Sequence, residues 1–174
     1  KVWEILRAFA SFGFCKAHAA AFALPTYQSA WLKTHYPAEF IAGVLTHDPG
    51  MYPKRLILDE ARQMGIVLAP LDVNKSDSTY RVEEHEGAQA IRIALSTISG
   101  ISDQEVRSIV KARPYVDIAD FIARSGASTP VTESLILTGG FDELHSIGTG
   151  EINHRDLLLH LNDICLLYTS PSPR

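Results

Sequence analysis

A change in the spacing of apolar residues near residue 66 limits the folds that this chain can adopt. Over residues 1–65 apolar side chains recur three and four positions apart, which is the period of a helix with one buried face. Residues 66–71 are instead a short apolar run, and residues 80–82 and 90–94 flank a polar connection at 83–87, which is typical of a β-hairpin. Short helical patterns return after residue 95. These periods predict a mainly α-helical protein with one small β-hairpin.

The change from the hairpin to short helices near residue 95 predicts two structural units. We expect a helical unit that includes the hairpin over residues 1–95, and a unit of short helices over residues 96–163. The final string, Ile164–Arg174, ends in serine and proline and resembles translated sequencing-adapter sequence. We therefore expect residues 164–174 to be non-native, with a flexible Ser/Pro tail as the alternative.

The segment from Leu95 to Arg113 has the pattern of a helix-hairpin-helix motif: an apolar helix end, a tight turn with glycine, a new helix start and then basic residues. Gly100 allows the backbone to turn tightly and to approach a phosphate closely. Amides at the start of the following helix can donate to the phosphate oxygens. The candidate DNA-binding residues are Ser99, Gly100, Ile101, Ser102, Lys111 and Arg113.

Two features of this motif also fit a plain connection between helices. Ser102 stands where a second glycine is usual, and Asp103 adds a negative charge at the turn. Ser102 and Glu105 have the spacing of a capping box, which stabilises a helix start without any ligand. From this segment alone, binding to the DNA backbone and a purely structural turn are both open.

Composition and motif spacing argue against several other functions. The net charge is -4 and the pI is about 6.0, so binding to nucleic acid requires a local basic patch. The seven histidines lack metal-ligand spacing, the two cysteines lie far apart, and no phosphate-binding glycine loop is present. No run of about 18 apolar residues exists, so we expect no membrane partner, and the cysteine usage favours a reducing cytoplasm.

The segment that begins at Phe12-Gly-Phe-Cys-Lys16-Ala-His18 closely resembles the fingers of bacterial C-family DNA polymerases, the DNA polymerase III alpha subunits and their error-prone paralogues. The resemblance covers about residues 1 to 160 in the family's order, and its further matches are 31–40, 59–66, 71–76, 98–113, 115–121 and 138–144. It implies that residues 1–95 are the rear of the fingers and that residues 96–163 are a helix-hairpin-helix DNA-binding module.

The resemblance also implies a nucleotide-binding role for two residues. The fingers of this family close over the incoming nucleotide, so Lys16 would bring charge to its triphosphate and His18 would donate to a phosphate oxygen. A solvated Lys16 and a packing histidine at His18 are the structural alternatives. Cys15 stands where many family members have asparagine, and Pro25 is expected to kink or divide the helix that carries His18.

Taken together, the resemblance implies a segment of a template-directed DNA polymerase that contacts the incoming nucleotide and the duplex backbone. The family's metal-binding palm aspartates and its sliding-clamp motif lie outside the matched stretch. We therefore expect no cofactor on this segment, Mg²⁺ in the parent polymerase, and no polymerase activity from the segment alone. The implied partners are primer-template DNA, deoxynucleoside triphosphates, and the clamp and other replisome or mutasome subunits through other regions. The alternative is a non-catalytic helix-hairpin-helix DNA-binding or adaptor protein.

Overall fold

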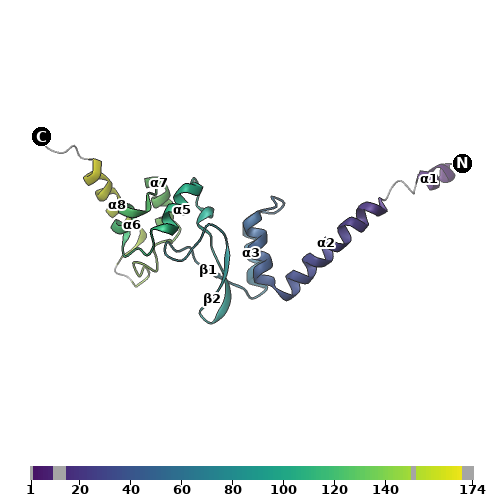
Figure 1. Ribbon diagram of the computed structural model, residues 1–174, viewed down its shortest axis with the longest axis horizontal. Coiled ribbons are helices and arrows are strands. Elements are labelled where there is room, and N and C mark those ends of the chain that lie inside the picture. The colour runs from purple at the N-terminus through teal and green to yellow at the C-terminus, as the bar shows by residue number, and fades with distance from the viewer. Residues whose placement is uncertain (1, 10–14, 150–151, 170–174) are drawn as a thin grey trace.

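Helices dominate the computed structural model, which describes residues 2–9, 15–149 and 152–169 (Figure 1). In chain order the elements are α1 (Val2–Phe9), α2 (Lys16–His35), α3 (Pro37–His47), α4 (Lys54–Gln63), β1 (Val67–Ala69), β2 (Arg81–His85), β3 (Ala88–Arg92), the 3₁₀ helix η1 (Leu95–Thr97), α5 (Asp103–Lys111), α6 (Ile118–Ser125), α7 (Thr129–Leu137) and α8 (His154–Thr169). The prediction of a mainly α-helical protein with a small β-hairpin is confirmed. No described helix is both long and apolar enough to cross a membrane.

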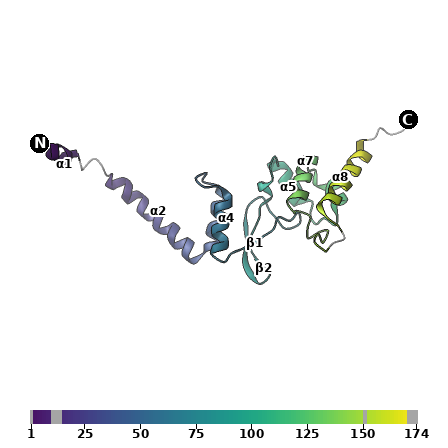
Figure 2. The same ribbon diagram turned by 180° about the vertical axis from the view of Figure 1, so that it is seen from behind.

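The long helix α2 extends away from the other elements, as both side views show (Figures 1 and 2). None of its side chains is buried. Pro25 lies inside α2 without dividing it, so of the two outcomes expected for this proline the division does not occur. A second helix, α3, then begins directly at Pro37, where the fixed φ of proline suits the first turn.

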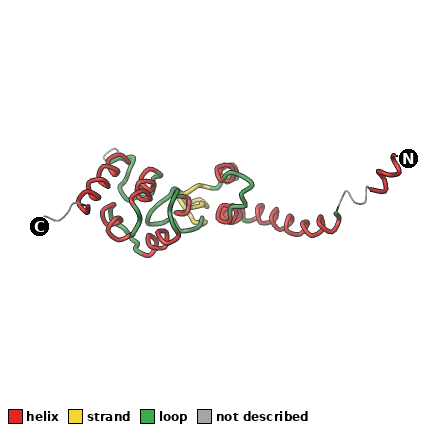
Figure 3. The backbone as a smooth tube through the Cα atoms, turned by 90° about the horizontal axis from the view of Figure 1, so that it is seen from above, coloured by secondary structure: helices red, strands yellow, loops and turns green. Residues whose placement is uncertain are grey.

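The sheet has the order β1-β3-β2 and lies between α3 and α4 on one side and the C-terminal helices on the other (Figure 3). Strands β2 and β3 form the predicted hairpin, with Arg81 opposite Arg92 and His85 opposite Ala88. The turn residues Glu86 and Gly87 both have positive φ, 53° and 78°, as a two-residue hairpin turn requires. The turn is therefore shorter than the predicted polar connection, and β1 adds a parallel pairing with β3.

Two clusters of buried apolar side chains follow one another along the chain. The first lies between α3, α4 and the sheet: Ala38, Ile41, Ala42, Leu45, Ile57, Ala61, Ile66, Tyr80, Ile91 and Ala94. The second joins η1 to the last four helices: Leu71, Val73, Leu95, Ile98, Val106, Ile109, Tyr115, Ile118, Phe121, Val131, Leu135, Ile136, Phe141, Leu157 and Leu161. Leu71 and Val73 precede the hairpin in sequence, yet they pack in the second cluster. The functional division at residue 95 stays a prediction.

The C-terminal string that we expect to be non-native continues α8 as far as Thr169. Ile164 is buried, and Cys165 packs against the second cluster and lies 3.7 Å from the Thr129 hydroxyl. Residues 170–174 fall outside the described residues. The origin of residues 164–174 stays a prediction.

Candidate nucleic-acid interface

The turn between η1 and α5 is held by buried residues that precede it, and its own residues are exposed. Leu95 and Ile98 are buried, and the amide of Leu95 donates to the Asp77 carbonyl at 2.8 Å. Ser99 and Gly100 are exposed. Gly100 has φ of 78°, and no atom lies within 4 Å of the position that a Cβ would take. The backbone at Gly100 is therefore open to a ligand as well as sharply turned.

Several backbone amides of this turn have no acceptor in the described part of the chain. They are the N–H groups of Ser99, Gly100, Asp103 and Gln104. The amide of Ile101 donates to the Ile98 carbonyl at 3.3 Å, and that of Ser102 donates to a Glu105 carboxylate oxygen at 2.9 Å. A helix start leaves such donors free by construction, and anions bind there. The hairpin can thus offer amides to a phosphate oxygen on both sides of Ser102.

The predicted capping box is present at the start of α5. The Ser102 hydroxyl accepts the amide of Glu105 at 3.2 Å, and the Glu105 carboxylate accepts the amide and the hydroxyl of Ser102 at 2.9 and 2.8 Å. These bonds leave Ile101 and Ser102 as structural members of the turn in this structure. Their contact with DNA stays a prediction.

Glu105 also joins α5 to the start of α7, which the sequence did not indicate. Its second carboxylate oxygen accepts the amide and the hydroxyl of Ser128, the N-cap of α7, at 3.0 and 2.8 Å. The backbone bonds from Ser102 and Ser128 lower the pKa of Glu105 to about 2, so the carboxylate is ionised at neutral pH. The Glu105 carboxylate therefore links the start of α5 to the start of α7.

The two predicted basic contacts differ in their surroundings. Lys111 is exposed in the last turn of α5. Arg113 is half-buried, and its guanidinium donates from Nε to the Val73 carbonyl at 2.7 Å and from Nη2 to the Ser76 carbonyl. Burial lowers the pKa of Arg113, although a guanidinium stays charged at neutral pH. Arg113 thus fixes the loop before the β-hairpin, and its role at a phosphate stays a prediction.

The loop that Arg113 holds is also tied to the segment after α5. Asn74 pairs with the backbone of Tyr115 in both directions: its Nδ2 donates to the carbonyl at 2.9 Å, and its Oδ1 accepts the amide at 2.8 Å. Within the loop, Asp72 Oδ1 accepts the amides of Asn74 and Lys75 at 2.6 and 2.9 Å. These contacts orient α5, and with it the Gly100 turn, relative to the sheet.

The predicted nucleotide-binding residues lie apart from the hairpin. Lys16 and His18 are exposed in the first turn of α2, at the end that points away from α5 (Figure 1). The His18 ring contacts Phe22 edge-on, with ring centroids 4.6 Å apart. The structure brings the hairpin residues together and leaves Lys16 and His18 as a separate exposed pair.

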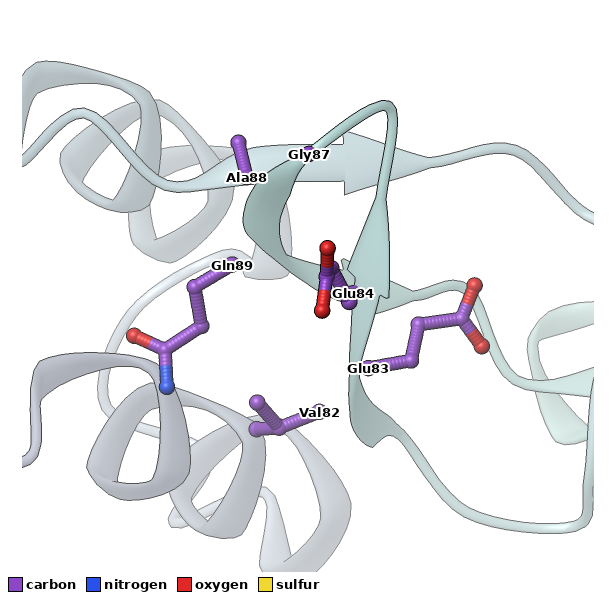
Figure 4. Close-up of a pocket in the computed structure, with 6 residues that line it drawn as sticks. All are labelled: Val82, Glu83, Glu84, Gly87, Ala88 and Gln89. Atoms are coloured by element: carbon purple, nitrogen blue, oxygen red, sulfur yellow. The ribbon is translucent and has the colours of Figure 1, made fainter.

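A shallow pocket on the β-hairpin is a poor match for phosphate (Figure 4). Its lining includes Glu83 and Glu84, whose negative charges repel an anion. Glu83 forms an ion pair with the buried Arg92, and Gln89 donates to Glu39 of α3 at 3.1 Å. These contacts serve the sheet. Within residues 2–9, 15–149 and 152–169 we also find no group of three or more His, Cys, Asp or Glu side chains suited to a metal ion.

Comparison with known proteins agrees with this reading of the turn. A family model described as a helix-hairpin-helix motif matches residues 65–148. The error-prone DNA polymerase of Bdellovibrio bacteriovorus is 37% identical over 171 residues, which cover 95% of this chain and 16% of that protein. The error-prone DNA polymerase of Symbiobacterium thermophilum is 35% identical over 170 residues, covering 83% of this chain and 16% of the relative.

A replicative relative gives the same result. The DNA polymerase III subunit alpha of Vibrio cholerae is 37% identical over 152 residues, which cover 83% of this chain and 13% of that protein. The chain therefore spans about a sixth or less of the length of these relatives. Because the match to the Bdellovibrio bacteriovorus protein covers 95% of this chain, it includes most of both core clusters, of α2 and of the Gly100 turn.

Proposed function

Because this chain belongs to the family of bacterial DNA polymerase III alpha subunits and error-prone DNA polymerases, we propose that it serves a template-directed DNA polymerase as the part that holds the duplex backbone. The observation that carries this proposal is a set of four amides around the exposed Gly100 turn that have no acceptor in the described part of the chain. Amide contacts to phosphate position a duplex without reading its sequence.

Duplex binding by the 174-residue chain tests this proposal. We expect fluorescence anisotropy to show binding to labelled blunt duplexes of unrelated sequence with similar affinity, weakening steeply as salt rises. Comparable anisotropy changes with two sequences and a linear dependence of log K on log salt would support it. Absence of binding at low salt would contradict it.

The second part of the proposal is that α2 contacts the incoming nucleotide through Lys16 and His18. It is supported by their shared exposure in the first turn of α2 and by the similarity to polymerases through this segment. In the parent polymerase we expect His18→Ala to raise the KM for deoxynucleoside triphosphates, with little change in duplex affinity. Unchanged incorporation kinetics would remove this role and favour a non-catalytic helix-hairpin-helix protein.

The remaining chemistry is assigned to the rest of the parent protein. The relatives are several times longer than this chain, and we place the metal-binding carboxylates, and the contacts to the sliding clamp and other subunits, on segments outside it. We expect the purified chain to give no Mg²⁺-dependent primer extension, and we assign the parent to the cytoplasm, where bacterial DNA is copied.

A further inference from the structure

Half of the lysine and arginine side chains in the described residues already have an acidic partner. The ion pairs are Lys33–Glu60, Lys54–Asp48, Arg62–Asp59, Lys75–Glu143, Arg81–Asp77, Arg92–Glu83 and Arg124–Asp120. A cation that is already paired gains less from a phosphate, because the existing pair must be broken. The cations near the hairpin that lack a carboxylate partner are therefore the ones to consider.

Two arginines beside the hairpin are committed to the fold. Arg113 donates to the carbonyls of Val73 and Ser76. Arg124 donates to the carbonyl of Ala112 at 2.6 Å, in addition to its ion pair with Asp120, and its guanidinium lies 5.1 Å from the centre of the Tyr115 ring. Moving either guanidinium to a phosphate would release backbone carbonyls that it now satisfies.

Arg107 and Lys111 differ from these two arginines. Both are exposed on α5, and within the described residues neither has a carboxylate partner. Asp103 lies four positions before Arg107 on the same face but forms no ion pair with it in the described residues, and Glu105 is engaged by Ser102 and Ser128. Residues four positions apart lie on the same face of a helix, about 6 Å apart along its axis. Arg107 and Lys111 therefore form one cationic strip, which begins one helical turn after the unpaired amides of Asp103 and Gln104.

We propose that Arg107 and Lys111, and not Arg113, are the cations that neutralise duplex phosphates next to the Gly100 turn. This inference rests on the proposed duplex-binding function and names the residues that carry its charge. Successive phosphates of one strand rise about 3.4 Å each along the duplex axis, so two extended side chains on this strip reach neighbouring or next-neighbouring phosphates. Sequence pattern alone had pointed to Arg113, because it cannot show that this side chain turns inward.

The test is the salt dependence of duplex binding by the 174-residue chain and its variants. Arg107→Gln and Lys111→Gln should each reduce the slope of log K against log salt by about 0.9, and the double variant by about two units. Arg55→Gln is the matched control, because Arg55 is exposed on α4 and also has no carboxylate partner among the described residues. Its slope should equal that of the wild type.

The outcomes separate the two proposals. A wild-type chain that does not bind duplex overturns the proposed function and this inference with it. A wild-type chain that binds while the double variant keeps the full slope overturns only the assignment of Arg107 and Lys111. Arg113→Gln should lower the thermal midpoint and keep the slope; a loss of slope with an unchanged midpoint would return the phosphate contact to Arg113.

Discussion

Glu105 receives donors from two helix starts, so its charge should matter more to stability than its partly exposed position suggests. Replacing it with glutamine keeps the shape but removes the charge-assisted bonds to Ser102 and Ser128. We expect Glu105→Gln to lower the free energy of unfolding by about 1 kcal/mol at neutral pH, a value kept small because solvent screens the site.

The pH dependence of this effect has a definite sign. The pKa of Glu105 is lowered from an ordinary 4.5 to about 2 in the folded chain. The ionised carboxylate therefore stabilises the fold above about pH 4.5, and that contribution is lost as the pH falls toward 2. Urea unfolding of both proteins should show the wild-type advantage shrinking between about pH 5 and about pH 3. An advantage that stays constant over this range would contradict the assignment.

Two glycines form a matched pair for testing the backbone at the turn. Gly100 has φ of 78°, where an L side chain is strained, whereas Gly43 lies inside α3 without a positive φ. Neither has an atom within 4 Å of a built Cβ, so steric clashes do not enter the comparison. We expect Gly100→Ala to cost about 1 kcal/mol and Gly43→Ala to add about 0.5–1 kcal/mol. Urea unfolding measures both, and effects of the same sign would contradict this account.

At the scale of elements, the loop 72–76 fixes the position of α5 and the Gly100 turn relative to the sheet. Asn74→Ala should cost about 1–3 kcal/mol, because it leaves the amide and the carbonyl of Tyr115 without their partner. Lys75→Ala is the control in the same loop, since the Lys75–Glu143 pair is largely exposed and is expected to contribute below about 1 kcal/mol. Equal losses in thermal unfolding would show that the pairing with Tyr115 does not hold the loop.

The same elements show which parts of the fold could be predicted from the sequence. The capping box of Ser102 and Glu105 and the cap of Asp117 on α6 were predictable, because each contact spans only three residues. The contacts that place the hairpin were not: Ser128 lies 23 residues from Glu105, and Tyr115 lies 41 from Asn74. Hydrophobic period carries no information on such pairings, nor on the parallel pairing of β1 with β3.

For the candidate site, the sequence pattern located the turn but not which amides and which cations are available to a phosphate. Gly100 was identified because its position in the motif is defined by backbone geometry. Amides at the start of the following helix were expected as donors, and the structure shows that those of Asp103 and Gln104 have no acceptor in the described residues. The inward turn of Arg113 depends on carbonyls of Val73 and Ser76, which are distant in sequence.

For the whole molecule, stability should reside in the two core clusters and not in α2. No side chain of α2 is buried, and among the described residues its ion pair to an element other than α3 is the half-exposed pair of Lys33 with Glu60. Removing residues 1–35 should therefore change the thermal midpoint by no more than about 4–8 °C, the shift that corresponds to about 1 kcal/mol in a small domain.

The comparison for that truncation is removal of α8 from residue 154 onward. Leu157, Leu161 and Ile164 are buried, and α8 packs against α6 and α7. Losing three buried aliphatic side chains removes about 1.5–3 kcal/mol each, which is a large share of the stability of a domain of this size. The cooperative unfolding transition of the second cluster should then be lost in calorimetry. If removal of α2 instead abolished the transition, the exposed helix would have to be a structural part of the core, and its availability for a nucleotide would be in doubt.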